Sequence, residues 1–283
     1  MKTRTLHGAD GLRLAADEAG KPGGPVALLL HGGGQVRQSW GGALSALAAA
    51  GMHAFALDLR GHGESDWSTT GDYDLDAYVR DLNRVIAEIG EPVVLIGASL
   101  GGLTSLVAAG EASRDRVRAL VLVDITTRPD PGGVNHIAAF MKSAPEGFAS
   151  VDEAADAVAR YMAHRPRPRD PSGLMRNLRE RDGRLYWHWD PAFFSPNRRI
   201  NTETERLESA ACAVTAPTLL VWGLRSEVVT PEGIATFRTL MPNAEVFAVA
   251  DAGHMVAGDK NDAFTSAVLA FVARRLDPPQ NCG

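Results

Sequence analysis

The chain has 283 residues, of which 45% are apolar and 22% charged, and 29 Lys and Arg against 34 Asp and Glu give a formal net charge of −5. A chain of this length and composition buries a large globular core without disulfides or metals, which excludes small stapled folds. The basic residues are scattered along the chain, so the sequence predicts neither a nucleic-acid partner nor a membrane partner.

The first residues, up to about position 11, lack the apolar stretch of a signal peptide, so a cytoplasmic protein is the expectation. Two stretches, 38–57 and 93–110, contain no Asp, Glu, Lys or Arg. Glycines and small polar residues interrupt both stretches, as in turns between a strand and a helix that are covered by protein. The sequence therefore predicts no membrane span.

Short apolar runs alternate with helical periodicity, which predicts an α/β fold with a mostly parallel, doubly wound sheet. Segments 3–7 and 12–17 flank the turn signal Gly-Ala-Asp-Gly and predict an antiparallel hairpin at one edge. The predicted buried strands are 26–30, 53–57, 93–96, 117–123, 218–222 and 245–249. The predicted helices between them are 39–50, 75–89, 100–111, 231–240 and 261–275.

Residues 128–212 depart from this alternation, because no buried strand is evident and Pro, Arg, Trp and acidic residues become frequent. We interpret this stretch as a helical cap or lid inserted after the sixth strand, with a helix over 151–163 and a stiff Pro-rich linker at 165–171. Residues 1–127 and 213–283 then form the core.

The strongest local signal is Gly97-Ala-Ser-Leu-Gly-Gly102, which directly follows an apolar strand and directly precedes a helix. A nucleophile elbow needs this placement, because a side chain that projects from so tight a turn requires small neighbours on both sides. Ser99 is thus the candidate nucleophile, activated at a helix N-terminus. The alternative is a glycine-rich turn that cradles a phosphate and that Ser99 merely caps.

His254, in Asp-Ala-Gly-His-Met, follows the last predicted strand, where a loop returns it toward the elbow. This order fits a chain in which the serine comes first, the acid second and the histidine last. His254 is therefore the candidate base, and no His-x-His or His-x-x-x-His pair suggests a metal.

The segment His-Gly-Gly-Gly-Gln follows the first predicted buried strand. Acyl transfer needs two N–H groups aimed at the developing oxyanion, and we assign them to Gly33 and Leu100, with Gly34 as the alternative to Gly33. A dinucleotide-binding loop is the competing interpretation. It is disfavoured because Arg37 stands where the third glycine of that motif is required.

Four elements in order, HGGG, DLRGHGES, GASLGG and a late AGH, resemble the α/β-hydrolase family over nearly the whole chain. The resemblance implies an eight-stranded sheet, a triad of serine, acid and histidine, and no cofactor or metal. Similar proteins with a serine at this position are esterases and their relatives.

The acid departs from the commonest family pattern, because Ser226 stands where relatives often carry aspartate after this strand. Glu227, one residue later, is our first choice for the triad acid. Asp124 is the alternative, since it ends the strand after which some relatives place the acid.

A serine nucleophile predicts acyl chemistry, and the leading hypothesis is an enzyme that hydrolyses small-molecule carboxylic esters through an acyl-enzyme. A cofactor-free perhydrolase, an acyltransferase and a carbon–carbon hydrolase share this triad and stay open, as does a binding protein that lacks turnover. Trp187, His188 and Met255 are the candidate substrate-binding residues. The sequence does not set the oligomeric state, and a homodimer is one alternative.

Overall fold

The computed structural model describes residues 1–162, 167–194, 203–256 and 261–276. Its centre is an eight-stranded sheet in the order β1-β2-β4-β3-β5-β6-β9-β10, in which β1 and β2 pair antiparallel, β2 is antiparallel to β4, and the remaining strands are parallel. The strands are β1 (Lys2–His7), β2 (Arg13–Ala19), β3 (Val26–Leu30), β4 (His53–Leu57), β5 (Val93–Ala98), β6 (Val117–Val123), β9 (Thr218–Gly223) and β10 (Glu245–Val249). This is the α/β hydrolase architecture that the sequence predicts.

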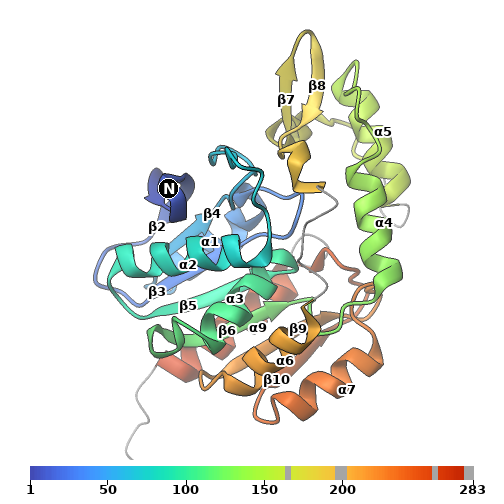
Figure 1. Ribbon diagram of the computed structural model, residues 1–283. Helices are drawn as coiled ribbons and strands as arrows, with labels where there is room; N and C mark the ends of the chain where they lie inside the picture. The colour runs from blue at the N-terminus through green and yellow to red at the C-terminus, as the bar shows by residue number, and fades with distance from the viewer. Residues whose placement is uncertain (163–166, 195–202, 257–260, 277–283) are drawn as a thin grey trace, which may run out of the picture.

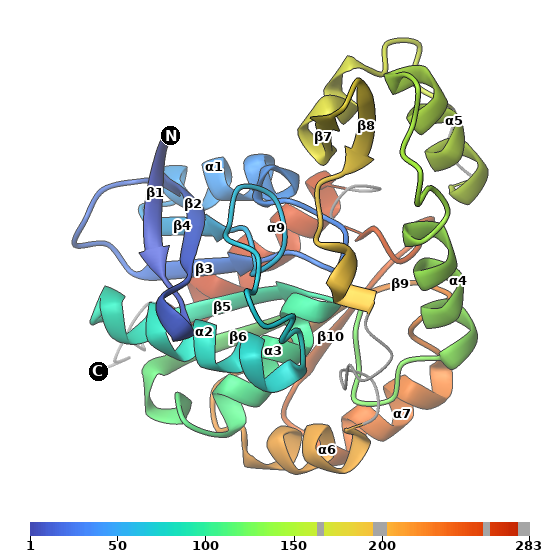
Figure 2. The same cartoon turned by 45° about the horizontal axis from the view of Figure 1, so that its top comes forward.

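Helices cover both faces of the sheet (Figures 1 and 2). On one face lie α1 (Gly41–Ala49) and α9 (Asn261–Leu276), and on the other lie α2 (Leu75–Ile89), α3 (Leu100–Gly110), α6 (Thr204–Ala213) and α7 (Pro231–Leu240). Strand β3 is a continuous apolar run because both of its faces are buried. Leu28 and Leu30 belong to the core on the α2 and α3 face, whereas Ala27 and Leu29 belong to the core on the α1 and α9 face. Short 3₁₀ turns are η1 (Ala9–Gly11), η2 (Arg37–Trp40), η3 (Arg114–Arg116), η4 (Ser172–Asn177) and η5 (Pro191–Phe194).

The described residues between β6 and α6, 128–162 and 167–194, form what we call the cap segment. It contains α4 (Pro131–Met141), α5 (Val151–Tyr161) and the antiparallel hairpin of β7 (Leu178–Arg181) and β8 (Arg184–Trp187). The hairpin projects away from the sheet, and α4 and α5 lie along the same side of the molecule (Figure 1). The cap segment is therefore not wholly helical, and α6, which the sequence analysis includes in the cap, packs instead on α3 of the core.

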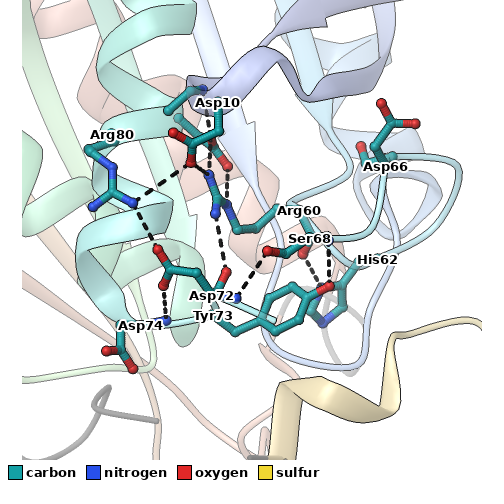
Figure 3. Close-up of polar contacts among 12 residues, drawn as sticks. Asp10, Arg60, His62, Asp66, Ser68, Asp72, Tyr73, Asp74 and Arg80 are labelled. Carbon is teal, nitrogen blue, oxygen red and sulfur yellow. Dashed lines mark hydrogen bonds and ion pairs between the residues drawn. The ribbon is translucent and has the colours of Figure 1, made fainter. Parts of the chain in front are cut away.

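A buried arginine, Arg60, fixes the long loop between β4 and α2 (Figure 3). Arg60 has no exposed side-chain surface and donates to both carboxylate oxygens of Asp81, at 2.6 and 2.7 Å. It also donates to the backbone oxygen of Asp72 at 3.1 Å, which closes the loop on itself. Because the guanidinium is satisfied on several sides, burial of its charge is compensated.

None of the helices in the described ranges combines the length and the apolar character that a membrane crossing requires.

Candidate active site

Ser99 occupies a tight turn between β5 and α3, with φ of 46° and ψ of −114°. A side chain on Gly97 would overlap the carbonyl of Gly101, and one on Gly101 would overlap the carbonyl of Leu30, so both positions require glycine. Ser99 itself is not glycine, and a positive φ at such a residue costs on the order of 1–3 kcal/mol. The predicted elbow geometry is thus present, and it places the half-buried Ser99 directly before the first residue of α3.

His254 meets the carboxylate of Asp124, which directly follows β6. The Nδ1 atom of His254 lies 2.8 Å from Oδ2 of Asp124. Asp124 has no exposed surface, and its Oδ1 accepts from the N–H of Gly223 at 2.9 Å while the hydroxyl of Ser226 donates to Oδ2 at 2.5 Å. A buried carboxylate with these partners is fixed in place, and it holds His254 in one orientation.

The first choice of the sequence analysis, Glu227, is wrong as the partner of His254. Its Oε2 lies 2.9 Å from Nδ1 of His136 on α4, and its side chain is 41% exposed. The physical reason is that Ser226, and not Glu227, occupies the position in the loop after β9 whose side chain reaches Asp124. The side chain of Glu227, one residue later, points to the cap segment. The structure thus supports Asp124, the alternative.

Two backbone N–H groups near Ser99 are suited to an oxyanion. Gly33 and Leu100 both line the cavity that contains Ser99, and within the described residues neither N–H has an internal hydrogen-bond partner. The N–H of Gly34 donates to Nε2 of His62 at 3.1 Å, so the structure disfavours Gly34 as the alternative donor. The loop is held further by Gln35, whose Oε1 accepts from Gly32 at 2.9 Å.

Three buried histidines connect this loop, the segment after β4 and the cap segment, and each ring accepts a backbone N–H. His31 accepts from Leu59 at 3.0 Å, His62 from Gly34, and His188 from Gly63 at 2.7 Å. An imidazole that accepts must be neutral, and burial lowers the pKa of His188 to about 3. In the described part of the chain, no group of three or more His, Cys, Asp or Glu side chains is arranged to hold a metal ion.

His188 is a second correction, because the sequence analysis assigns it to substrate binding. It is 2% exposed, does not line the cavity that contains Ser99, and instead joins the cap segment to the loop that follows β4. The sequence carries no signal for this role, since the contact joins positions 125 residues apart.

The cavity that contains Ser99 and His254, here called the Ser99 cavity, has a volume of about 550 Å³. Trp187 and Met255 line it, where the sequence analysis places them, and the sulfur of Met255 accepts from the side-chain amide of Gln35 at 2.9 Å. Its other lining side chains are mostly apolar, and nothing in the sequence gives a reason to expect several of them: Ile137, Met141, Val158, Leu174, Phe193 and Phe194. The site therefore pairs a serine and a histidine with an apolar binding surface.

Comparison with known sequences shows to which protein family the chain belongs. Residues 25–260 match the sequence profile of the alpha/beta hydrolase fold. The chain belongs to this family. It is similar to the sn-1-specific diacylglycerol lipase ABHD11 of Mus musculus, with 30% identity over 88% of this chain and 81% of that protein. It is similar also to esterase Rv0045c of Mycobacterium tuberculosis, with 31% identity over 89% of this chain and 84% of that protein.

A shorter match joins the chain to protein phosphatase methylesterase 1 of Mus musculus, at 31% identity over 46% of this chain and 35% of that enzyme. Among solved structures, that of the M. tuberculosis esterase Rv0045c superposes with a TM-score of 0.74 at 27% identity, covering 96% of this chain and 92% of that one. The structure of E-2-(acetamidomethylene)succinate hydrolase superposes with a TM-score of 0.81 over 96% of this chain and 99% of that one, but at 23% identity this likeness concerns the fold alone. The homologues are esterases, lipases and other hydrolases, so the chain is a hydrolase of this family.

Proposed function

We propose that the protein hydrolyses carboxylic esters through a covalent acyl-enzyme on Ser99. The observation that carries the proposal is that Ser99, on a strained elbow, and His254, held by Asp124, line one apolar cavity. The relatives named as an esterase and a lipase support the same class of reaction.

The reaction begins when the hydroxyl oxygen of Ser99 attacks the ester carbonyl carbon and the hydroxyl proton passes to Nε2 of His254. Nδ1 of His254 donates to Asp124, so the ring carries the charge next to a carboxylate. The N–H groups of Gly33 and Leu100 stabilise the negative oxygen of the tetrahedral intermediate. Collapse of the intermediate breaks the bond to the alcohol, which leaves with the proton from His254.

Water then attacks the acyl-enzyme, again with His254 as the base, and the carboxylic acid leaves as Ser99 recovers its proton. Asp124 orients His254 through its contact with Nδ1 and balances the charge of the imidazolium. The low polarity of the cavity strengthens each of these electrostatic contacts.

The test is hydrolysis of short p-nitrophenyl esters, followed as free acid, by the wild type, Ser99→Ala and Ser45→Ala. Ser45 lies on α1 and its hydroxyl contacts the backbone of Gly41, so its variant is the matched control. We expect Ser99→Ala to lower kcat by about 10⁵-fold or more and Ser45→Ala to leave it unchanged. Stoichiometric acylation of the wild type without release of acid would instead favour the binding-protein alternative.

A further inference from the structure

The cap segment has a second cavity, of about 610 Å³, which we call the cap cavity. Helices α4 and α5 separate it from the Ser99 cavity, because opposite faces of α4 line the two spaces. Ile137, Ala138 and Met141 face the Ser99 cavity, whereas His136, Ala139 and Ser143, just beyond the helix, face the cap cavity. On α5 the same division places Val158 on one side and Ala157 on the other.

Two aromatic side chains, Phe140 of α4 and Tyr161 of α5, line both cavities, and we call this pair the aromatic wall. Their rings stack at 4.2 Å between centroids with 10° between their planes. Burial, followed by the charge of Glu227, raises the pKa of Tyr161 to about 12, so the phenol stays neutral. The described residues give no other side chain that borders both spaces.

The aromatic wall also packs on one aromatic side chain from the lining of each cavity. Phe140 lies 5.6 Å from the ring of Trp187, which lines the Ser99 cavity. Tyr161 lies 5.2 Å from the ring of His136, which lines the cap cavity. Removal of the Phe140 ring would thus open a path between two existing spaces rather than a closed void in the core.

We propose that the aromatic wall ends the acyl-binding part of the Ser99 cavity and that Phe140 sets the longest straight acyl chain the enzyme accepts. This inference rests on the proposed esterase function. The acyl group is assigned to the side of the cavity that the aromatic wall borders, because the acyl group stays bound to Ser99 through both steps whereas the alcohol leaves after the first. The cap cavity is the space into which a longer chain extends once the wall is removed.

The preferred chain length is set by two opposing effects, the burial of acyl methylenes in the cavity and their steric overlap with the aromatic wall. Each methylene that enters an apolar pocket improves transition-state binding by about fourfold in kcat/KM. A chain that reaches a packed aromatic pair gains nothing more, and further methylenes must displace the wall or remain in water. The profile of kcat/KM against chain length therefore has a maximum at the wall.

The test compares kcat/KM for p-nitrophenyl esters of straight acids from two to sixteen carbons in the wild type and in Phe140→Ala. We expect the maximum of Phe140→Ala to move to longer chains, with a gain of at least about tenfold in the ratio of long to short esters. Phe148→Ala is the control for loss of an aromatic ring from the cap segment, because Phe148 lines only the cap cavity. Its ring also packs on Trp187, at 5.0 Å between centroids, so this variant loosens the cap segment while the stack of Phe140 on Tyr161 stays in place. Phe148→Ala should keep the wild-type maximum.

A second variant tests the cap cavity itself. Ala157 is buried on the face of α5 toward the cap cavity, so Phe140→Ala combined with Ala157→Leu partly fills the newly joined space. This double variant should move the maximum back toward shorter chains. Where Phe140→Ala is insoluble, Phe140→Leu provides the same comparison with a smaller shift.

An active Phe140→Ala or Phe140→Leu whose maximum matches the wild type overturns the inference while the esterase function stands. An equal shift in Phe148→Ala also overturns it, because the effect then comes from general loosening of the cap segment. A shift that appears only when the alcohol chain is lengthened overturns the assignment of the acyl group. Inactivity of the wild type toward every ester overturns the proposed function and this inference together.

Discussion

Replacement of Asp124 by asparagine is expected to lower kcat for ester hydrolysis by about 10⁴-fold, the loss typical of a triad acid replaced by its amide. The carboxylate of Asp124 accepts from Nδ1 of His254, so Nε2 is free to take the proton of Ser99. An asparagine keeps the shape but can present its N–H₂ to the ring, which favours the wrong tautomer. Initial rates at saturating ester for the purified variant measure the effect.

The matched control is Glu227→Gln, which changes the other candidate acid in the same way. Its carboxylate contacts His136 near the surface, so kcat should remain close to that of the wild type. The reverse ranking of the two variants would contradict the geometry and would make Glu227 the acid.

Arg60→Met is expected to destabilise the fold by about 3–5 kcal/mol, because it leaves the carboxylate of Asp81 buried without its cation. Asp81 is 4% exposed, and without Arg60 its carboxylate retains the hydrogen bond from the N–H of Ala9 at 2.8 Å. Figure 3 shows how Arg60 joins the segments that carry Asp10, Asp72 and Tyr73. A decrease in Tm of about 10 °C or more follows for a chain of this size.

The control for this prediction is Arg13→Met, which removes a hydrogen-bonded ion pair at the surface. Arg13 contacts Asp66 at 2.9 Å, but 72% of its side chain is exposed, so solvent screens the pair. Thermal unfolding followed by circular dichroism compares the two variants. Equal Tm values for Arg60→Met and Arg13→Met would show that the Arg60 network contributes no special stability.

The sheet could be predicted because its strands are covered on both faces and their sequences are therefore apolar without interruption. The predicted strand over 117–123 and helices over 75–89 and 231–240 have the observed bounds. The elbow could be predicted for a similar reason. Positions 97 and 101 require glycine because a side chain there would overlap backbone atoms. A requirement for glycine can be recognised directly in the sequence.

The acid could not be chosen correctly, because the choice depends on loops that follow β6 and β9, about one hundred residues apart. Locally, Glu227 and Asp124 are both carboxylates after a buried strand. Only the packed loops show that Ser226 turns toward Asp124 while Glu227 turns toward His136. One signal was present in the sequence, since Asp124 directly continues the strand that ends at Val123.

The cap segment was predicted least well. Helix α4 begins with Pro131 after Asp130, whose carboxylate accepts from the N–H of Gly133 at 3.0 Å, which is a recognisable start signal. The two glycines in its first turn obscured that signal, and Gly133 is required because a side chain there would overlap the carbonyl of Glu227. The hairpin of β7 and β8 has few buried residues, so its sequence lacks a strand pattern. The predicted helix end at 163 and part of the linker at 165–171 lie outside the described residues.

Covalent labelling by a fluorophosphonate decides whether Ser99 is an activated nucleophile. The folded wild type and Ser99→Ala are treated with the probe, and intact mass and peptide mapping locate any adduct. We expect one adduct per chain, on Ser99, and none in Ser99→Ala. A folded wild type that stays unlabelled, or an adduct on another side chain, would contradict this expectation.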